Sequence, residues 1–183
     1  MRVSVLCGSL RTGSYNQALL DAAIAGGEAH GLEIVQGDIS GFPLFSQDLE
    51  ASGYPPQVDE VKRLIQSSEC LLLVTPEHNY GVPGVLKNAI DLLSRPYGDP
   101  TLNGRRLALM GASTGYHGTL RAQMAWRQVW HFFKAPVFEG AELTLASARD
   151  AFDGEGRLVS DRSVDALEAY LVALAAWLAG ECR

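Results

Sequence analysis

The chain has 183 residues, the size of one domain, which is long enough to bury a hydrophobic core without disulfides or metals. Hydrophobic residues make up 47% of it and charged residues 20%, and this balance excludes a largely disordered chain. Fifteen basic against 21 acidic side chains give a net charge of −6. That sign argues against nucleic acid or an anionic membrane surface as the main partner.

Targeting signals and cysteines point to one compartment. No apolar run approaches the roughly 18 residues of a membrane span, and the first seven residues lack the layout of a signal peptide. The three cysteines, Cys7, Cys70 and Cys182, are widely spaced and form no Cys-x-x-Cys or Cys/His metal pattern. We therefore expect reduced thiols in a cytoplasmic protein, with Cys7 in the core and Cys182 exposed at a frayed end.

Short apolar runs alternate with amphipathic segments along the whole chain. In order, we expect a strand at 3–7, a helix capped by Ser14 that continues through Ile24, a strand at 32–35, an irregular segment at 37–56, a helix at 56–68 and a strand at 70–74. The second half is expected to hold a helix at 83–93, a strand at 106–110, a helix at about 118–134, candidate strands at 135–138 and 142–145, a polar loop at 147–160 and a helix at 163–179.

This alternation predicts one α/β domain over residues 1–183, with a doubly wound, five-stranded parallel sheet between two layers of helices. The run 70–74 is the clearest strand, because continuous apolar residues are typical of a parallel strand covered on both faces. In the helix expected at 118–134, Trp126, Trp130 and Phe133 recur at helical spacing. Core packing is the expected reason, and a subunit interface is the alternative.

Ligands of open parallel sheets bind beyond the carboxyl ends of the strands. Three segments follow such ends: residues 8–16 (the first loop), 75–84 (the second loop) and 111–118 (the third loop). All three are rich in Gly, Ser, Thr and Asn. We expect them to form one site.

The first loop leads from a strand into a helix N-terminus, where free N–H groups and the helix dipole favour an anion. Ser9, Thr12, Ser14 and Asn16 add hydroxyl and amide donors, and Arg11 adds a positive charge. The loop lacks the lysine of a Walker A motif and does not read G-x-G-x-x-G. It predicts a site for a terminal phosphate group, the alternative being an ordinary polar turn.

The second loop holds the adjacent pair Glu77 and His78. Neighbouring side chains on extended backbone point apart, so a catalytic dyad is not expected, and the pair falls short of a metal site. Two prolines and two glycines make this loop stiff and closely approachable. It suits a planar ligand against main-chain N–H groups, flanked by His78 or Tyr80.

The third loop contains three glycines and small hydroxyl residues, which permit close approach of the backbone to a ligand. Tyr116 or His117 can cover a ring there. The alternative is a glycine-rich turn with an aromatic side chain packed on the surface.

These motifs resemble the NAD(P)H-dependent FMN reductases with a flavodoxin-like fold, a family that includes quinone, chromate and azo-dye reductases. The first loop is similar to the family's G-S-x-R-x-x-S-x-N motif. The segment from Pro76 to Pro96 is similar to P-E-Y-N, P-G-x-L-K-N-A-I-D and S-R-P, and residues 113–122 to S-x-G and G-G-x-R-A. Two positions depart from the pattern: His78 replaces a tyrosine and Thr119 replaces a glycine.

The resemblance implies a flavodoxin-like domain that binds FMN and uses NAD(P)H as co-substrate. It assigns the phosphate to Ser9, Arg11, Ser14, Asn16 and Gln17. It assigns the isoalloxazine ring to Pro76, Glu77, Asn79 and neighbouring backbone of the second loop, where His78 and Tyr80 are the candidate flanking side chains. Ser113, Thr114 and Gly115 would approach the ring or ribityl chain.

The implied reaction is a ping-pong transfer of hydride from NAD(P)H to the flavin N5 and on to a quinone, free flavin, chromate or azo compound. No catalytic side chain and no metal are expected, and the implied assembly is a homodimer or tetramer. The alternatives are a non-enzymatic FMN-binding electron carrier or redox sensor, and a hydrolase with Ser9 or Ser14 as nucleophile. The hydrolase is disfavoured because no G-x-S-x-G motif is present.

Overall fold

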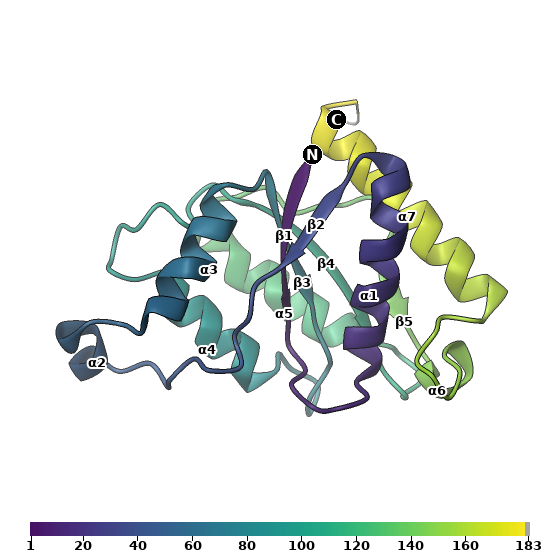
Figure 1. The fold of residues 1–183 in the computed structure, drawn as a ribbon, viewed down its shortest axis with the longest axis horizontal. Coiled ribbons are helices and arrows are strands. Elements are labelled where there is room, and N and C mark those ends of the chain that lie inside the picture. The colour runs from purple at the N-terminus through teal and green to yellow at the C-terminus, as the bar shows by residue number, and fades with distance from the viewer. Residues whose placement is uncertain (182–183) are drawn as a thin grey trace.

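The computed structural model describes residues 1–181 and contains one five-stranded sheet, in which every neighbouring pair is parallel (Figure 1). The strand order is β2-β1-β3-β4-β5. The strands are β1 (Arg2–Cys7), β2 (Glu33–Gln36), β3 (Cys70–Val74), β4 (Arg106–Ala112) and β5 (Leu143–Leu145). This arrangement confirms the predicted flavodoxin-like, doubly wound parallel sheet.

Helices cover both faces of the sheet, giving the predicted three layers. One face packs against α1 (Tyr15–Gly27) and α7 (Asp161–Ala179), which lie side by side in Figure 1. The other face packs against α3 (Pro56–Gln66), α4 (Gly84–Leu93) and α5 (Leu120–His131). Three short elements complete the described chain: η1 (Glu28–His30), α2 (Gln47–Ser52) and α6 (Ala148–Ala151).

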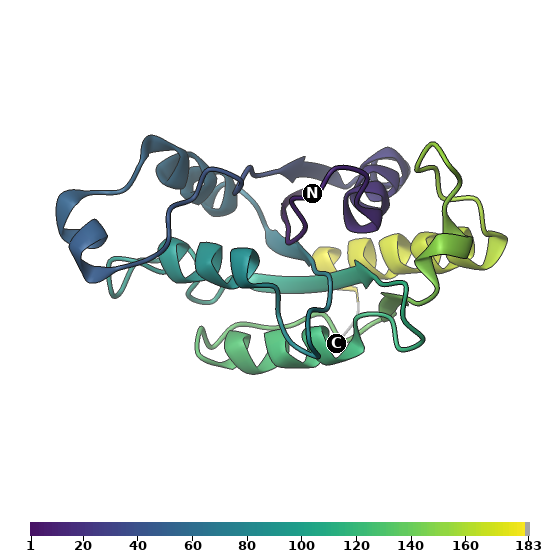
Figure 2. The ribbon, with the colours of Figure 1, turned by 90° about the horizontal axis from the view of Figure 1, so that it is seen from below.

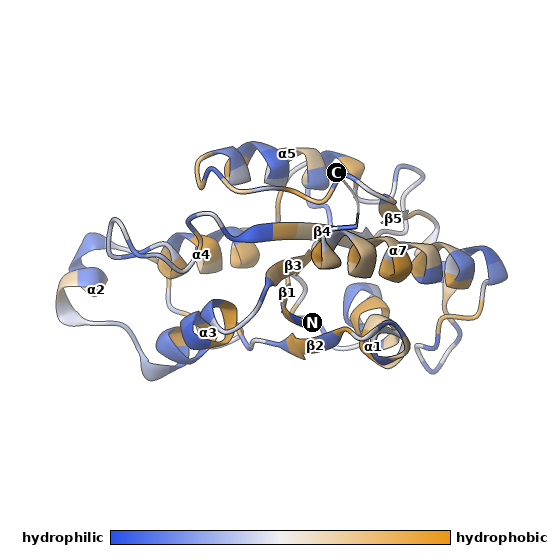
Figure 3. Cartoon of the chain, turned by 90° about the horizontal axis from the view of Figure 1, so that it is seen from above, coloured by the Kyte–Doolittle hydropathy of each residue, from blue (hydrophilic) through white to orange (hydrophobic). Residues whose placement is uncertain are grey.

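The central strands are apolar because both of their faces are covered. All five residues of β3 are buried, and they alternate between the two cores, with Leu72 and Val74 on one side and Leu71 and Leu73 on the other. In Figure 3, β1 and β3 are largely apolar at the centre of the molecule, whereas α3 carries polar residues on its outer side. Because β1, β3 and β4 are parallel, the loops that follow them lie at the same end of the sheet, which is the end seen in Figure 2.

The sequence prediction misses some local structure. The candidate strand at 135–138 is wrong: Val137 forms only an isolated bridge to Leu107, since the neighbouring Pro136 has no N–H to extend a ladder. The other candidate, 142–145, is confirmed as β5. The two segments expected to be irregular, 37–56 and 147–160, contain the short helices α2 and α6.

Trp126 and Trp130 of α5, and Phe133 just after it, belong to the core, as expected. Trp126 and Trp130 are fully buried and Phe133 is 6% exposed. The indole N–H of Trp126 donates to the Thr75 hydroxyl at 3.0 Å, and that of Trp130 to the Arg105 carbonyl at 2.8 Å. These bonds fix α5 against the ends of β3 and β4.

The two described cysteines, Cys7 and Cys70, are buried and carry free thiols. The prediction for Cys182 lies outside the described residues. Burial raises the pKa of both thiols, to about 12 at Cys70, so neither is a ready thiolate. Among residues 1–181 no helix combines the length and the apolar character that a membrane crossing requires.

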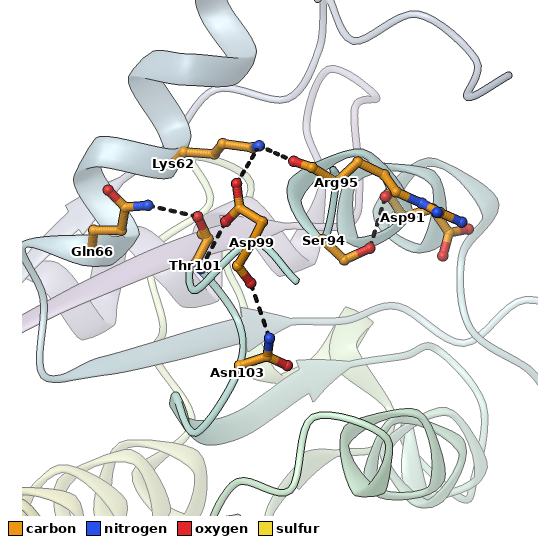
Figure 4. A network of polar contacts seen from close by, with 8 residues as sticks. All are labelled: Lys62, Gln66, Asp91, Ser94, Arg95, Asp99, Thr101 and Asn103. Atoms are coloured by element: carbon orange, nitrogen blue, oxygen red, sulfur yellow. Dashed lines mark hydrogen bonds and ion pairs between the residues drawn. The ribbon is translucent and has the colours of Figure 1, made fainter. Parts of the chain in front are cut away.

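A polar network ties the turn after α4 to α3 (Figure 4). The largely buried ammonium of Lys62 donates to the Arg95 carbonyl and, at 2.9 Å, to the Asp99 carboxylate. Burial alone raises the pKa of Asp99, but hydrogen bonds from Thr101 and Lys62 outweigh it, and the pKa lies below its ordinary value.

We predict that Asp99→Asn lowers the free energy of unfolding by about 3 kcal/mol near pH 7, because it leaves Lys62 without its counter-ion. The pKa of Asp99 is lower in the folded than in the unfolded chain, so its contribution is full above about pH 4 and is lost as the pH falls through the folded-state value. Urea unfolding at neutral and acid pH measures both effects. The exposed Asp165→Asn is the control, and a deficit that persists unchanged at acid pH would contradict the assignment.

Candidate functional site

The three predicted loops meet around one cavity of about 500 Å³ at the carboxyl end of the sheet. Its lining contains most of the expected residues: Ser9, Arg11, Ser14, Asn16, Pro76, Glu77, His78, Ser113 and Thr114. It also contains residues that were not singled out as ligands, namely Leu10, Tyr15, Val85 and Ala112, together with Gly8, Pro83 and Gly84. The expected ligands Gln17, Asn79, Tyr80 and Gly115 do not line it.

The first loop presents an unusual number of free donors. Ser14 caps α1, its Oγ accepting hydrogen bonds from the N–H groups of Asn16 at 3.2 Å and Gln17 at 3.4 Å. The backbone N–H groups of residues 9–15 have no acceptor within residues 1–181. Together with the start of a 13-residue helix, they form a place that favours a bound anion.

The side chain of Asn16 makes backbone contacts that the sequence did not predict. Its side chain is buried, its Nδ2 donates to the Ala112 carbonyl at 2.9 Å, and its Oδ1 accepts from the Ala112 N–H at 2.9 Å. The amide thereby ties the first loop to the end of β4. Its position on the first turn of α1, facing the sheet, makes it a clamp between two loops of the site.

Gln17 lies on another side of α1. Its Nε2 donates to Asp21 at 2.9 Å and to Gln36 on β2 at 3.1 Å. One residue along a helix turns a side chain by about 100°, so the neighbour of a cavity-facing residue faces elsewhere. Gln17 therefore does not line this cavity, and its expected role in the phosphate site stays a prediction.

A glycine allows the first two loops to approach. A Cβ on Gly8 would lie 2.8 Å from Pro83 Cγ and 3.0 Å from Pro76 Cδ. No larger residue fits without moving both prolines. Contact with the two prolines of the stiff second loop therefore restricts the start of the first loop.

In the second loop, Glu77 and His78 have separate roles, as expected from their opposed directions. The Glu77 carboxylate is nearly buried, and its Oε2 accepts from the N–H groups of Arg121 at 2.9 Å and Ala122 at 3.1 Å. Glu77 therefore caps α5 from a distant segment of the chain. His78 is exposed and lines the cavity.

A tight turn removes the next two residues from the cavity. His78 and Gly81 exchange backbone hydrogen bonds of 3.1 and 2.9 Å, and between them Asn79 and Tyr80 have φ values of 50° and 63°. Two successive left-handed residues reverse the chain and turn both side chains outward. The Tyr80 ring instead lies 4.1 Å from the guanidinium of Arg121.

The third loop closes the cavity from the side of β4. The Ser113 N–H donates to the Leu145 carbonyl at 2.8 Å, and its Oγ accepts from the Gly115 N–H at 3.1 Å. This turn directs Ser113 and Thr114 to the cavity and Gly115 away from it. Thr119, the departure from the family pattern, is buried beneath the loop and accepts from Gln123, so it does not alter the lining.

The geometry favours binding over side-chain catalysis. Neither Ser9 nor Ser14 hydrogen-bonds to a histidine in the described part of the chain, which removes the support for a serine hydrolase. Residues 1–181 contain no cluster of His, Cys, Asp and Glu suited to a metal ion. The sequence also did not predict that Arg121 lies beside Glu77 and Tyr80, although the R of the G-G-x-R-A motif marks this residue.

Comparison with known proteins agrees with this geometry. Residues 1–150 match the family described as NADPH-dependent FMN reductase. An NAD(P)H-dependent FMN reductase of Pseudomonas aeruginosa is 43% identical over 178 residues, which cover 97% of this chain and 95% of that protein. An NAD(P)H:quinone oxidoreductase of Solanum tuberosum is 39% identical over 194 residues, covering 100% and 97%.

Among solved structures, FerB from Paracoccus denitrificans, a flavoenzyme NAD(P)H:(acceptor) oxidoreductase, superposes with a TM-score of 0.88 at 29% identity and covers 98% of this chain and 97% of that one. Sequence and fold therefore agree over nearly the full length of the described chain. The chain belongs to the NADPH-dependent FMN reductase family and is an oxidoreductase that works with FMN and NAD(P)H.

Proposed function

We propose that the protein passes reducing equivalents from NAD(P)H through FMN to a quinone or a similar small acceptor. One observation carries this proposal: the first loop, with its free backbone N–H donors, lines the same cavity as the two stiff, closely approachable loops beside it. Quinones are named as the substrate of the Solanum relative and of a Pseudomonas putida quinone reductase that is 37% identical over 177 residues.

The first loop fits the phosphate end of FMN. The N–H groups of residues 9–15 need an acceptor, and a phosphate offers several acceptor oxygens. The hydroxyls of Ser9 and Ser14 and the guanidinium of Arg11 add donors at the same wall. These three side chains are our proposed phosphate ligands, with Asn16 holding the loop in place through Ala112.

The remaining wall fits a flat ring. Pro76, Glu77 and His78 come from the second loop, and Ser113 and Thr114 from the third. Their backbones are held by the close packing at Gly8 and by the turn at Ser113. We propose these five residues as the surroundings of the isoalloxazine ring and ribityl chain.

When bound, FMN supplies the redox chemistry, taking two electrons from NAD(P)H and passing them to the acceptor. The chain supplies position. Glu77 is committed to the N–H groups of α5, whereas His78 lines the cavity and its ring forms no hydrogen bond with residues 1–181. We therefore propose that His78 influences acceptor binding and that no side chain is an indispensable acid or base.

The proposed reaction is tested directly by turnover. Protein loaded with FMN should oxidise NADH or NADPH when a benzoquinone is present, and double-reciprocal plots at several quinone concentrations should be parallel, because both substrates use one site in turn. Stopped-flow absorbance near ~450 nm follows each half of the reaction. FMN-loaded protein that oxidises neither nucleotide with any quinone would overturn the proposal.

The phosphate site is tested by comparing two flavins. We predict that Arg11→Met weakens FMN binding about tenfold, the effect of losing one charge-assisted hydrogen bond, and leaves riboflavin binding unchanged because riboflavin lacks the phosphate. Fluorescence titration measures both affinities. Arg63→Met, on the exposed side of α3, is the control. Equal losses for both flavins would place Arg11 elsewhere than at the phosphate.

We also propose that the protein acts as a homodimer or tetramer in the cytoplasm. Exposed apolar side chains on α5 support self-association: Leu120 is 39% exposed, Met124 57% and, just after the helix, Phe132 67%. The free thiols of Cys7 and Cys70 suit a reducing compartment.

Light scattering on the purified protein should give a mass of two or four times 19.7 kDa. Met124→Glu should lower that mass, because a charge on this helix face opposes burial in an interface. A mass of one chain for the unaltered protein would contradict the proposal.

A further inference from the structure

We propose that a second cavity, next to the third loop, binds the adenosine 5′-phosphate half of NAD(P)H. This inference rests on the proposed function, since it assigns a place to part of the co-substrate. The cavity has a volume of about 590 Å³ and lies between β5, α6 and the N-terminal end of α7. In Figure 1, α6 lies at the end of the molecule where β1 enters the first loop.

The third loop is the wall between the two cavities. Thr114 lines the flavin cavity, and Tyr116, two residues further, lines the second cavity. The third loop is bonded to residues that line the second cavity. The Ser113 N–H donates to the Leu145 carbonyl at 2.8 Å, and the Ser147 N–H donates to the Gly115 carbonyl at 3.3 Å. A co-substrate made of two nucleotides joined by a pyrophosphate can therefore place one half on each side of this loop.

The floor of the second cavity offers donors that lack acceptors. Ser163 is only 7% exposed, lines the cavity, and its Oγ has no hydrogen-bond partner within residues 1–181. Ser160, the N-cap of the 19-residue helix α7, makes no side-chain capping bond. The N–H group of Arg162, which also lines the cavity, has no acceptor in the described chain. These groups suit phosphate oxygens at a helix N-terminus.

Charges at the rim select a nucleotide over a bare anion. Arg162 is exposed there and forms no ion pair with a described carboxylate, so its guanidinium is available for a phosphate. Glu142 and Asp150, also at the rim, repel an isolated anion but accept hydrogen bonds from ribose hydroxyls, the role that acidic residues have in dinucleotide sites. The Tyr116 ring, 87% exposed, offers a surface on which a base can stack.

The kinetic test compares NADH and NADPH with reduced nicotinamide mononucleotide, which lacks the adenosine half. With FMN-loaded enzyme and a fixed quinone, Arg162→Gln should raise the KM for the dinucleotides about tenfold and leave the KM for the mononucleotide unchanged. Arg149→Gln is the matched control, because Arg149 is exposed on neighbouring α6 but does not line the cavity. Equal changes for dinucleotide and mononucleotide, or no change for either, would overturn the inference.

A binding test uses AMP and inorganic phosphate as probes of FMN-loaded protein in calorimetry. AMP should bind and compete with NADH, and Ser163→Asp should abolish this binding by placing a carboxylate among the phosphate donors. Inorganic phosphate that binds as tightly as AMP would overturn the assignment to a nucleotide. Unaltered protein that oxidises none of NADH, NADPH and the mononucleotide would instead defeat the proposed function, so the two failures are distinguishable.

Discussion

The clamp between Asn16 and Ala112 is the interaction on which the site depends. It joins the start of α1 to the end of β4, residues 96 positions apart, through two hydrogen bonds of 2.9 Å from one buried amide. Because the amide both donates and accepts, this one side chain satisfies both backbone groups of Ala112. The clamp fixes the distance between the loop that offers free N–H groups and the loop that closes the cavity, and so defines the space between them.

The second loop completes this frame from the opposite side. Gly8 lets the first loop pack directly on Pro76 and Pro83, and the Glu77 carboxylate caps α5 across 44 positions of sequence. A carboxylate whose oxygen accepts from two backbone N–H groups has a structural role and is poorly placed to move protons. The protein therefore provides a rigid, donor-rich container, which is what a family whose cofactor performs the chemistry requires.

The site could be predicted in outline because glycine, proline and hydroxyl residues at strand ends carry their own conformational meaning. Residue-level roles were harder to predict. The family resemblance suggested Asn16 and Gln17 as phosphate ligands, yet Asn16 bonds to the Ala112 backbone and Gln17 bonds to Gln36. Asn79 and Tyr80 adopt left-handed conformations that an asparagine tolerates but a tyrosine rarely does, so local preference could not indicate the turn.

The sequence by itself determined the alternation of the main strands and helices along the chain and the parallel sheet with apolar residues on both faces of β3. It also determined that three loops meet at the carboxyl end of the sheet. These features could be predicted because periodicity and strand-end chemistry are local properties. Only the tertiary structure decided which of the loop side chains face the cavity, that Glu77 serves α5, and that donors at the start of α7 open into a second cavity behind Tyr116. Those outcomes depend on contacts between residues far apart in the chain, which no local pattern records.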